Sequence, residues 1–101
     1  MPYQFLFSLR FRDDIREARK WYNRQQKGLG KKFYSEVKRS LEAIEQTPQF
    51  QVRYDEIRCL PLKKYPFMIH FTIDEQQKSI LILGCIHCSL EPHSHWVKEN
   101  P

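Results

Sequence analysis

The amino-acid sequence predicts an α+β fold in which two helices pack on one side of a mostly antiparallel sheet. Hydrophobic residues first alternate with a period of two, then repeat at helical spacing through two segments, and finally return to a period of two in three segments. The expected order is an N-terminal strand, an antiparallel hairpin of two helices, and a three-stranded antiparallel sheet. Because 101 residues lie near the lower end of the single-domain range, we expect one domain over residues 1–101.

The first strand is expected over residues 3–9. Its apolar side chains occur at every second position, and polar side chains occupy part of the other face. The alternating apolar residues are Tyr3, Phe5, Phe7 and Leu9. This pattern is typical of a strand that turns one face toward the core.

The first helix is expected to begin at Asp13 and Asp14, as an N-cap and a first-turn acid that complements the helix dipole. Apolar side chains then follow at intervals of three and four residues until Gly28, where the helix should end. The sequence Gly28-Leu29-Gly30 predicts a stop and a tight connection. A second helix should then continue as far as Thr47-Pro48. Its apolar residues are Phe33, Val37, Leu41 and Ile44.

Three further strands are expected over residues 56–62, 67–73 and 79–87, with residues 74–78 linking the last two. Residues 80–83, Ile-Leu-Ile-Leu, are apolar on both faces. A strand that is covered on both faces lies inside a sheet, so the last strand should be central.

Positive charge is concentrated in the predicted helices. The chain has a formal net charge of +5, and residues 10–39 contain eleven Lys or Arg against four Asp or Glu. A solvated helix surface accounts for such a pattern, and so does a surface that binds nucleic acid or an acidic protein. The candidate binding residues are Arg16, Arg19, Lys20, Arg24, Lys31 and Lys32.

Cysteine usage and hydropathy both favour the cytoplasm. The three cysteines are an odd number and are best interpreted as reduced thiols. No segment has the roughly 18 consecutive apolar residues of a membrane span, and the N-terminus lacks a secretory signal. We therefore expect a cytoplasmic protein.

Cys85, Cys88, His93 and His95 supply thiolate and imidazole groups, the ligands that a tetrahedral zinc site requires. Cys85 and Cys88 are an odd number of residues apart, so in a strand they point to opposite faces. The sequence also lacks a glycine-rich phosphate loop and a serine nucleophile motif. We therefore expect no metal and no cofactor.

Cationic and aromatic residues accumulate in the C-terminal half. The set comprises Arg53, Tyr54, Arg58, Lys63, Lys64, Tyr65, His70 and His87. On one shared surface these groups could stabilise phosphate charge and transfer protons during attack by an RNA 2′-hydroxyl, while the aromatic rings stack an unpaired base. The structural alternative is that the aromatic rings pack between sheet and helices and that Arg58 and the lysines are solvent charges.

Several short motifs follow one another in a specific order between Phe7 and Trp96. In the N-terminal half they are Asp14-Ile15-Arg16-Glu17-Ala18, Trp21-Tyr22, Gly28-Leu29-Gly30, Phe33 and Glu36-Val37. In the C-terminal half they are Arg58, Leu62-Lys63-Lys64-Tyr65-Pro66-Phe67, Ile69, Phe71, Ile86-His87-Cys88-Ser89-Leu90-Glu91-Pro92 and Trp96. Together they resemble the RelE/ParE superfamily of toxins from bacterial type II toxin-antitoxin systems, also known as plasmid stabilisation proteins.

The resemblance implies one of two activities. RelE-type toxins are mRNA interferases that cleave messages in the ribosomal A site, and ParE-type toxins poison DNA gyrase. The long helical hairpin and its Gly-Leu-Gly junction are more similar to the ParE type, and Leu90 stands where a basic residue is common in the family. We therefore expect ParE-like growth inhibition that a cognate antitoxin neutralises, in a homodimer or a toxin-antitoxin hetero-oligomer.

The alternative is a RelE-like endoribonuclease, and it leaves open whether the chain is an enzyme. In that case the resemblance implies Arg58 as the phosphate-stabilising cation, Lys63 or Lys64 as a second cation, and His87 as the acid or base. A third possibility is a decayed toxin that retains only antitoxin binding.

Overall fold

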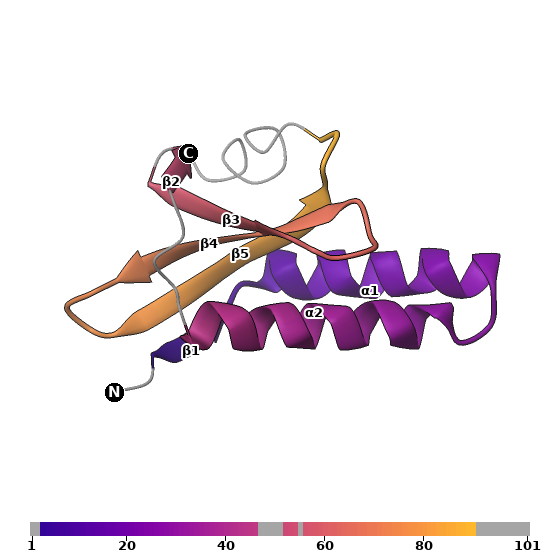
Figure 1. The fold of residues 1–101 in the computed structure, drawn as a ribbon, viewed down its shortest axis with the longest axis horizontal. Coiled ribbons are helices and arrows are strands. Elements are labelled where there is room, and N and C mark those ends of the chain that lie inside the picture. The colour runs from indigo at the N-terminus through magenta and orange to yellow at the C-terminus, as the bar shows by residue number, and fades with distance from the viewer. Residues whose placement is uncertain (1–2, 47–51, 55, 91–101) are drawn as a thin grey trace.

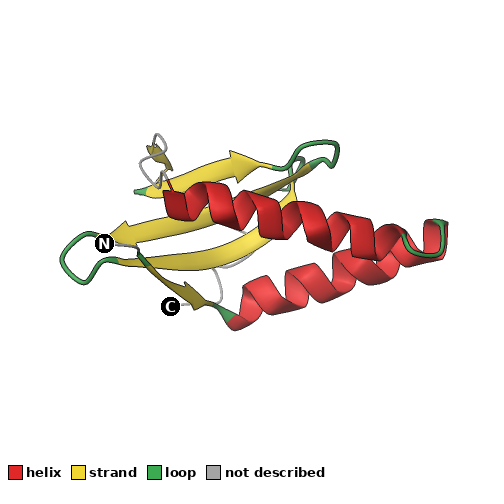
Figure 2. Cartoon of the chain, turned by 60° about the horizontal axis from the view of Figure 1, so that its bottom comes forward, coloured by secondary structure: helices red, strands yellow, loops and turns green. Residues whose placement is uncertain are grey.

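The computed structural model describes residues 3–46, 52–54 and 56–90 as a single sheet with two helices on one face (Figures 1 and 2). The elements are β1 (Gln4–Phe7), α1 (Leu9–Gln25), α2 (Leu29–Gln46), β2 (Val52–Tyr54), β3 (Ile57–Pro61), β4 (Phe67–Asp74) and β5 (Ser79–His87). The predicted α+β order is confirmed, with β2 as an additional short strand. Neither helix combines the length and the apolarity that crossing a bilayer requires.

The sheet has five strands in the order β1-β5-β4-β3-β2. β5 lies between β1 and β4, as its two apolar faces predict. The neighbouring pairs among β2, β3, β4 and β5 are antiparallel, whereas β1 pairs with β5 in parallel. The parallel pair requires a long crossover, which the helical hairpin provides.

The start of α1 differs from the sequence prediction. The helix begins at Leu9, which was expected in the first strand, and Ser8 rather than Asp13 is its N-cap. The Ser8 hydroxyl accepts a hydrogen bond from the Phe11 N–H at 3.0 Å and donates one to the Leu83 carbonyl at 2.7 Å. The contact with β5 fixes Ser8 next to the sheet, so the helix starts there and Asp13 and Asp14 lie inside it.

The connection between the helices is shorter than predicted. α1 ends at Gln25, Gly28 adopts a left-handed conformation with φ 87°, and α2 already begins at Leu29. Gly30 is therefore a buried residue of α2 and not part of the stop. A Cβ atom at Gly30 would lie 2.6 Å from the Arg19 carbonyl oxygen, so glycine is needed there for close contact between the helices.

The main core lies between the helices and the sheet. Its completely buried side chains are Phe33, Val37, Ile44, Ile69, Phe71, Ile80 and Ile82. A smaller cluster of Ile57, Cys59 and Ile86 occupies the opposite face of the sheet. On that face the Cys59 Sγ atom lies 3.2 Å from Nδ1 of the buried His70.

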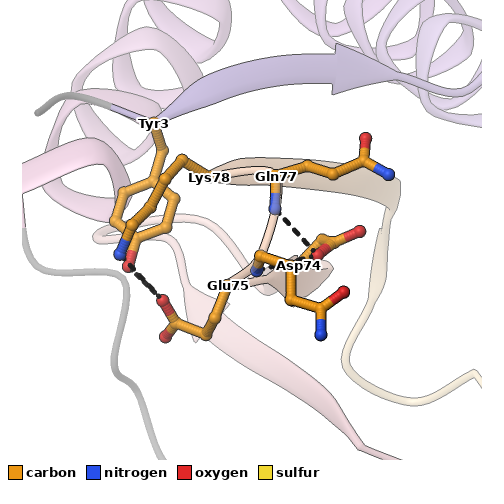
Figure 3. Close-up of polar contacts among 6 residues, drawn as sticks. Tyr3, Asp74, Glu75, Gln77 and Lys78 are labelled. Carbon is orange, nitrogen blue, oxygen red and sulfur yellow. Dashed lines mark hydrogen bonds and ion pairs between the residues drawn. The ribbon is translucent and has the colours of Figure 1, made fainter.

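The turn between β4 and β5 is held to β1 by side chains (Figure 3). The Asp74 carboxylate accepts the backbone N–H groups of Gln76 and Gln77 at 3.0 and 3.1 Å, and the Tyr3 hydroxyl donates to Glu75 at 2.7 Å. The hydrogen bond from Tyr3 is the main cause that lowers the pKa of Glu75, and the charges of Lys78 and Arg58 lower it further. The contact from Tyr3 connects the start of the N-terminal edge strand β1 to the turn between the antiparallel strands β4 and β5.

Candidate functional site

A cleft of about 300 Å³ lies between α1 and the end of β5. Ala18, Phe67, Cys85 and Ile86 contribute apolar surface to it. Its remaining lining residues are Asp14, Glu17, Trp21, Arg24, His87 and Leu90. Trp21 and Leu90 are 50% and 51% exposed, so the cleft has large hydrophobic side chains that remain accessible to a ligand.

His87 is half-buried in this cleft. It ends β5 opposite Phe67 in the register with β4, and the two rings lie 5.4 Å apart in an edge-on arrangement. The backbone N–H of Ser89 donates to Nδ1 of His87 at 3.1 Å, and the Ser89 hydroxyl lies 2.8 Å from the same atom. This geometry assigns the proton of the neutral ring to Nε2, so neutral His87 is a donor at that atom.

The charges around the cleft are mixed. Asp14 and Glu17 supply two carboxylates, whereas Arg24 is the only Lys or Arg among the described lining residues. A site that stabilises a phosphate transition state needs preorganised donors or cations directed at the developing negative charge. The cleft around His87 provides little of this, and Leu90 adds an apolar side chain at its edge.

Lys63 and Lys64 lie in the turn between β3 and β4, and both are exposed. The backbone N–H of Lys63 donates to the buried Glu36 carboxylate at 3.3 Å, and Lys64 has a left-handed backbone with φ 70°. Neither lysine lines the cleft that contains His87. The turn is therefore anchored to α2 through its backbone while both ammonium groups stay in solvent.

Arg58 and His87 are separated along the strand direction of the sheet. It pairs with Phe71 on β4, four residues beyond Phe67, a separation of about 13 Å along the strand. It shares the helix-facing side of the sheet with the core residue Phe71, and its Nε and Nη1 atoms are buried without a hydrogen-bond partner among the described residues. The structure does not gather Arg58 and His87 into one cleft.

The remaining members of the cationic and aromatic set are distributed over both faces. Tyr65 packs edge-on against Tyr22 and Phe33 in the main core, with ring centroids 5.2 and 5.3 Å apart. His70 is buried on the opposite face beside Cys59. The side chains of Arg53 and Tyr54 lie outside the described part of the structure. Packing therefore explains the described aromatic residues of this set.

The described residues contain no group of three or more His, Cys, Asp or Glu side chains that could hold a metal ion. Cys85 is buried in the main core, whereas Cys88 is exposed. Burial is the largest cause that raises the pKa of the Cys85 thiol, followed by the charges of Asp14 and Cys88. His93 and His95 lie outside the described residues.

A second concave surface, the helix groove, lies between α1 and α2. It has a volume of about 470 Å³. Its lining residues are Phe11, Arg12, Ile15, Arg16, Arg19, Lys20, Asn23 and Tyr34. The Arg19 guanidinium carbon lies 4.6 Å from the Tyr34 ring centroid, and Lys38 Nζ lies 5.1 Å from it. Cations thus line one wall of the groove and also cover its aromatic residue.

The structure brings together three of the six predicted binding residues, Arg16, Arg19 and Lys20, in the helix groove. Arg24 lines the cleft near His87 instead, and Lys31 and Lys32 are exposed at the start of α2 without lining either concavity. Sequence analysis missed Arg12. Its spacing of four and eight residues from Arg16 and Lys20 was the available signal.

Comparison with protein-family models and with curated proteins finds no match. Solved structures do match. A chain from the chromosomal ParDE toxin-antitoxin system of P. aeruginosa has a TM-score of 0.75 and 16% identity, with 84% of this chain and 95% of that chain covered. A mutant of the E. coli toxin RelE in the free state has a TM-score of 0.72 and 13% identity, with 100% of both chains covered.

The RelBE2 toxin-antitoxin complex of Mycobacterium tuberculosis matches with a TM-score of 0.60 and 14% identity, covering 86% of this chain and 99% of that chain. These matches define a small α+β fold found in structures of toxins and toxin-antitoxin complexes. In particular, the chain has the RelE/ParE toxin fold, which confirms the resemblance seen in the sequence at the level of the fold.

Proposed function

We propose that the chain is the toxin of a type II toxin-antitoxin system and inhibits growth by a ParE-like action on DNA gyrase. The observation that carries the toxin assignment is the match of nearly the whole fold to chains from ParDE and RelE structures. The proposed protein acts in the cytoplasm, where a cognate antitoxin neutralises it in a toxin-antitoxin hetero-oligomer. Plasmid stabilisation is the corresponding biological role.

The chemistry of the cleft near His87 supports the gyrase action over RNA cleavage. Two carboxylates and Leu90 surround the histidine, and Arg58 lies at another level of the sheet. Exposed Trp21 and Leu90 are side chains that a protein target can contact. A protein-binding poison uses such a surface without needing a cluster of cations around one phosphate.

The second candidate function is a RelE-like mRNA endoribonuclease. The full-length match to E. coli RelE favours it. Arg58, Lys63 or Lys64, and His87 would then supply the cations and the proton-transfer group. A decayed toxin that binds only its antitoxin is the third candidate, because Leu90 replaces a cation that the family commonly has.

Induced expression without antitoxin distinguishes the three candidates. Growth, protein synthesis, message integrity and DNA integrity are followed in the same bacterial culture. A gyrase poison is expected to cause DNA damage and filamentation with intact messages, and the purified protein should inhibit supercoiling by purified gyrase. Early arrest of translation with cleaved messages would contradict the gyrase action, and undisturbed growth would indicate a decayed toxin.

Arg58→Ala and His87→Ala provide the matched test of the nuclease alternative. A RelE-like enzyme should lose toxicity in both variants while circular dichroism shows that each remains folded. Retention of growth arrest in both folded variants excludes these residues as the catalytic pair. Lys63→Ala and Lys64→Ala extend the same test to the exposed turn.

A further inference from the structure

We propose that Cys59, His70 and Met68 bind a single Cu(I) ion on the outer face of the sheet. The outer face is the side opposite the helices, where the smaller hydrophobic cluster lies. The three residues supply a thiol, an imidazole and a thioether. This site is separate from the cleft near His87, and its metal binding does not depend on the proposed toxin activity.

The pairing of β3 with β4 brings the donor residues together (Figure 1). Cys59 lies directly opposite His70, and its Sγ atom is 3.2 Å from His70 Nδ1. Met68 precedes His70 by two residues on β4, so both side chains point to the same face. Met68 is diagonal to Cys59, within reach of a side chain as long as methionine, and it packs against the cluster that contains Cys59. The three donors therefore belong to one patch of the outer face.

The contact between Cys59 and His70 is close to the spacing that a shared metal ion imposes. Bonds of about 2.3 Å to sulfur and about 2.0 Å to nitrogen, at a tetrahedral angle, place the two ligand atoms about 3.5 Å apart. The observed distance between Sγ and Nδ1 is 3.2 Å. Small rotations of the two side chains are therefore sufficient to accommodate the ion without a change in strand register.

The combination of donors favours Cu(I) over other biological metals. Thiolate and thioether sulfur are soft ligands that select Cu(I), whereas carboxylate and carbonyl oxygens suit Mg²⁺ and Ca²⁺. Structural zinc needs four ligands, and the described residues hold no group of three or more His, Cys, Asp or Glu side chains. A site of two sulfur atoms and one imidazole nitrogen therefore matches Cu(I), and the thioether of Met68 distinguishes it from a zinc site.

Charge balance permits the ion to lie in an apolar cluster. Binding removes the Cys59 thiol proton, so one proton is released for each Cu(I) ion that is bound. The thiolate then neutralises the single positive charge, and the imidazole and the thioether are uncharged. Because an unpaired buried charge is costly, the neutral complex suits this position in the sheet.

Burial separates metal binding from nucleophilic catalysis, which a thiol beside an imidazole can also support. Cys59 and His70 are only 8% and 1% exposed, so an organic substrate cannot lie against the Sγ atom. Met68 is half-buried and therefore offers its sulfur to an ion that arrives from solvent. A single ion can pass from Met68 to the two buried donors by ligand exchange.

Competition with a coloured Cu(I) chelator tests the proposal on the full chain. The reduced protein is titrated without oxygen into the Cu(I) complex of bicinchoninate, and the loss of colour measures transfer of the ion. Cys88→Ser serves as the reference protein, because Cys88 is an exposed thiol outside the proposed site. We expect this variant to take up one Cu(I) ion per chain, with the same affinity as the unaltered chain.

Two conservative changes in the same cluster provide the matched comparison. Met68→Leu removes the thioether and nearly conserves volume, so it should weaken Cu(I) binding by about tenfold or more while the fold is retained. Ile86→Val trims a cluster residue that supplies no donor, and it should leave the affinity unchanged. Cys59→Ser should abolish binding, and circular dichroism checks that this variant is folded. Equal affinities of Met68→Leu and Ile86→Val would overturn the three-donor site.

Nuclear magnetic resonance identifies the histidine ligand in the unaltered protein. Cu(I) should shift the Nδ1 resonance of His70 and leave that of His87 in place. This measurement needs no variant, so it tests the site even where Cys59→Ser does not fold. A shift at His87 alone, loss of binding in Cys88→Ser, or equally tight binding of Zn²⁺ would each overturn the proposal.

Discussion

The Asp14 carboxylate on α1 accepts a hydrogen bond from the backbone N–H of Cys85 on β5 at 3.0 Å. β1 accompanies β5 only as far as the Phe7–Ile82 pair, so β5 continues beyond its parallel neighbour. Beyond this point the side chains of Ser8 and Asp14 hydrogen-bond the backbone of β5. Ser8 contacts the Leu83 carbonyl, and Asp14 contacts the Cys85 N–H. The first turns of α1 thus serve as the lateral partner of the strand where β1 has ended.

Asp14→Ala should destabilise the fold by about 1–3 kcal/mol, because it leaves a partly buried backbone donor without its acceptor. Urea denaturation measures the loss. Asp13→Ala is the matched control, since the exposed Asp13 carboxylate pairs with the exposed Arg16 in the described part of the chain, and it should change stability by less than about 0.5 kcal/mol. Equal losses in the two variants would show that the Cys85 contact contributes little.

Gly30→Ala should cost about 1–3 kcal/mol, because its Cβ would lie 2.6 Å from a backbone oxygen of the neighbouring helix. Gly28→Asn is a suitable comparison: no atom lies within 4 Å of a Cβ at Gly28, and asparagine tolerates a left-handed backbone. Thermal unfolding should therefore show a much lower melting temperature for the Gly30 variant. A larger loss at Gly28 would contradict the close helix contact.

Cys88 should be the only one of the three cysteines that iodoacetamide modifies in the native protein at pH 8. Cys88 is exposed, whereas Cys59 and Cys85 are buried, and burial raises the pKa of the Cys85 thiol. Mass spectrometry should find one label in the native state and three in urea. Cys88→Ser should abolish native labelling, and a native label on Cys85 would contradict its burial.

Stability should fall as the pH rises past about 9 and 10. Burial raises the pKa of Cys85 and of Tyr22 above their ordinary values of 9.0 and 10.0, and the charge of Tyr65 adds to the shift of Tyr22. The unfolded chain therefore loses these protons first, which favours unfolding at alkaline pH. Urea titrations between pH 8 and 11 should show this decline, and Tyr22→Phe should make it shallower. An unchanged slope in that variant would exclude Tyr22 as a contributor.

The candidate sites were less predictable than the fold. The basic character of the hairpin was evident from residues 10–39, but the sequence grouped Arg24, Lys31 and Lys32 with residues from which the structure separates them. Residue type likewise led us to group Arg58 and His87 in one candidate site. The register of β3, β4 and β5 shows that they lie apart along the sheet. Residue type shows which chemistry is available, whereas grouping requires the relative positions of different elements.

The order of strands and helices and most of the core could be predicted from the amino-acid sequence, because the period of the apolar residues reflects local backbone geometry. The three-dimensional packing was needed to find that β1 pairs in parallel with β5, that Asp14 supports β5, and that Gly30 permits the close helix contact. The Asp14–Cys85 bond joins residues 71 positions apart. No local pattern encodes such a partner, because it depends on how the hairpin packs across the sheet.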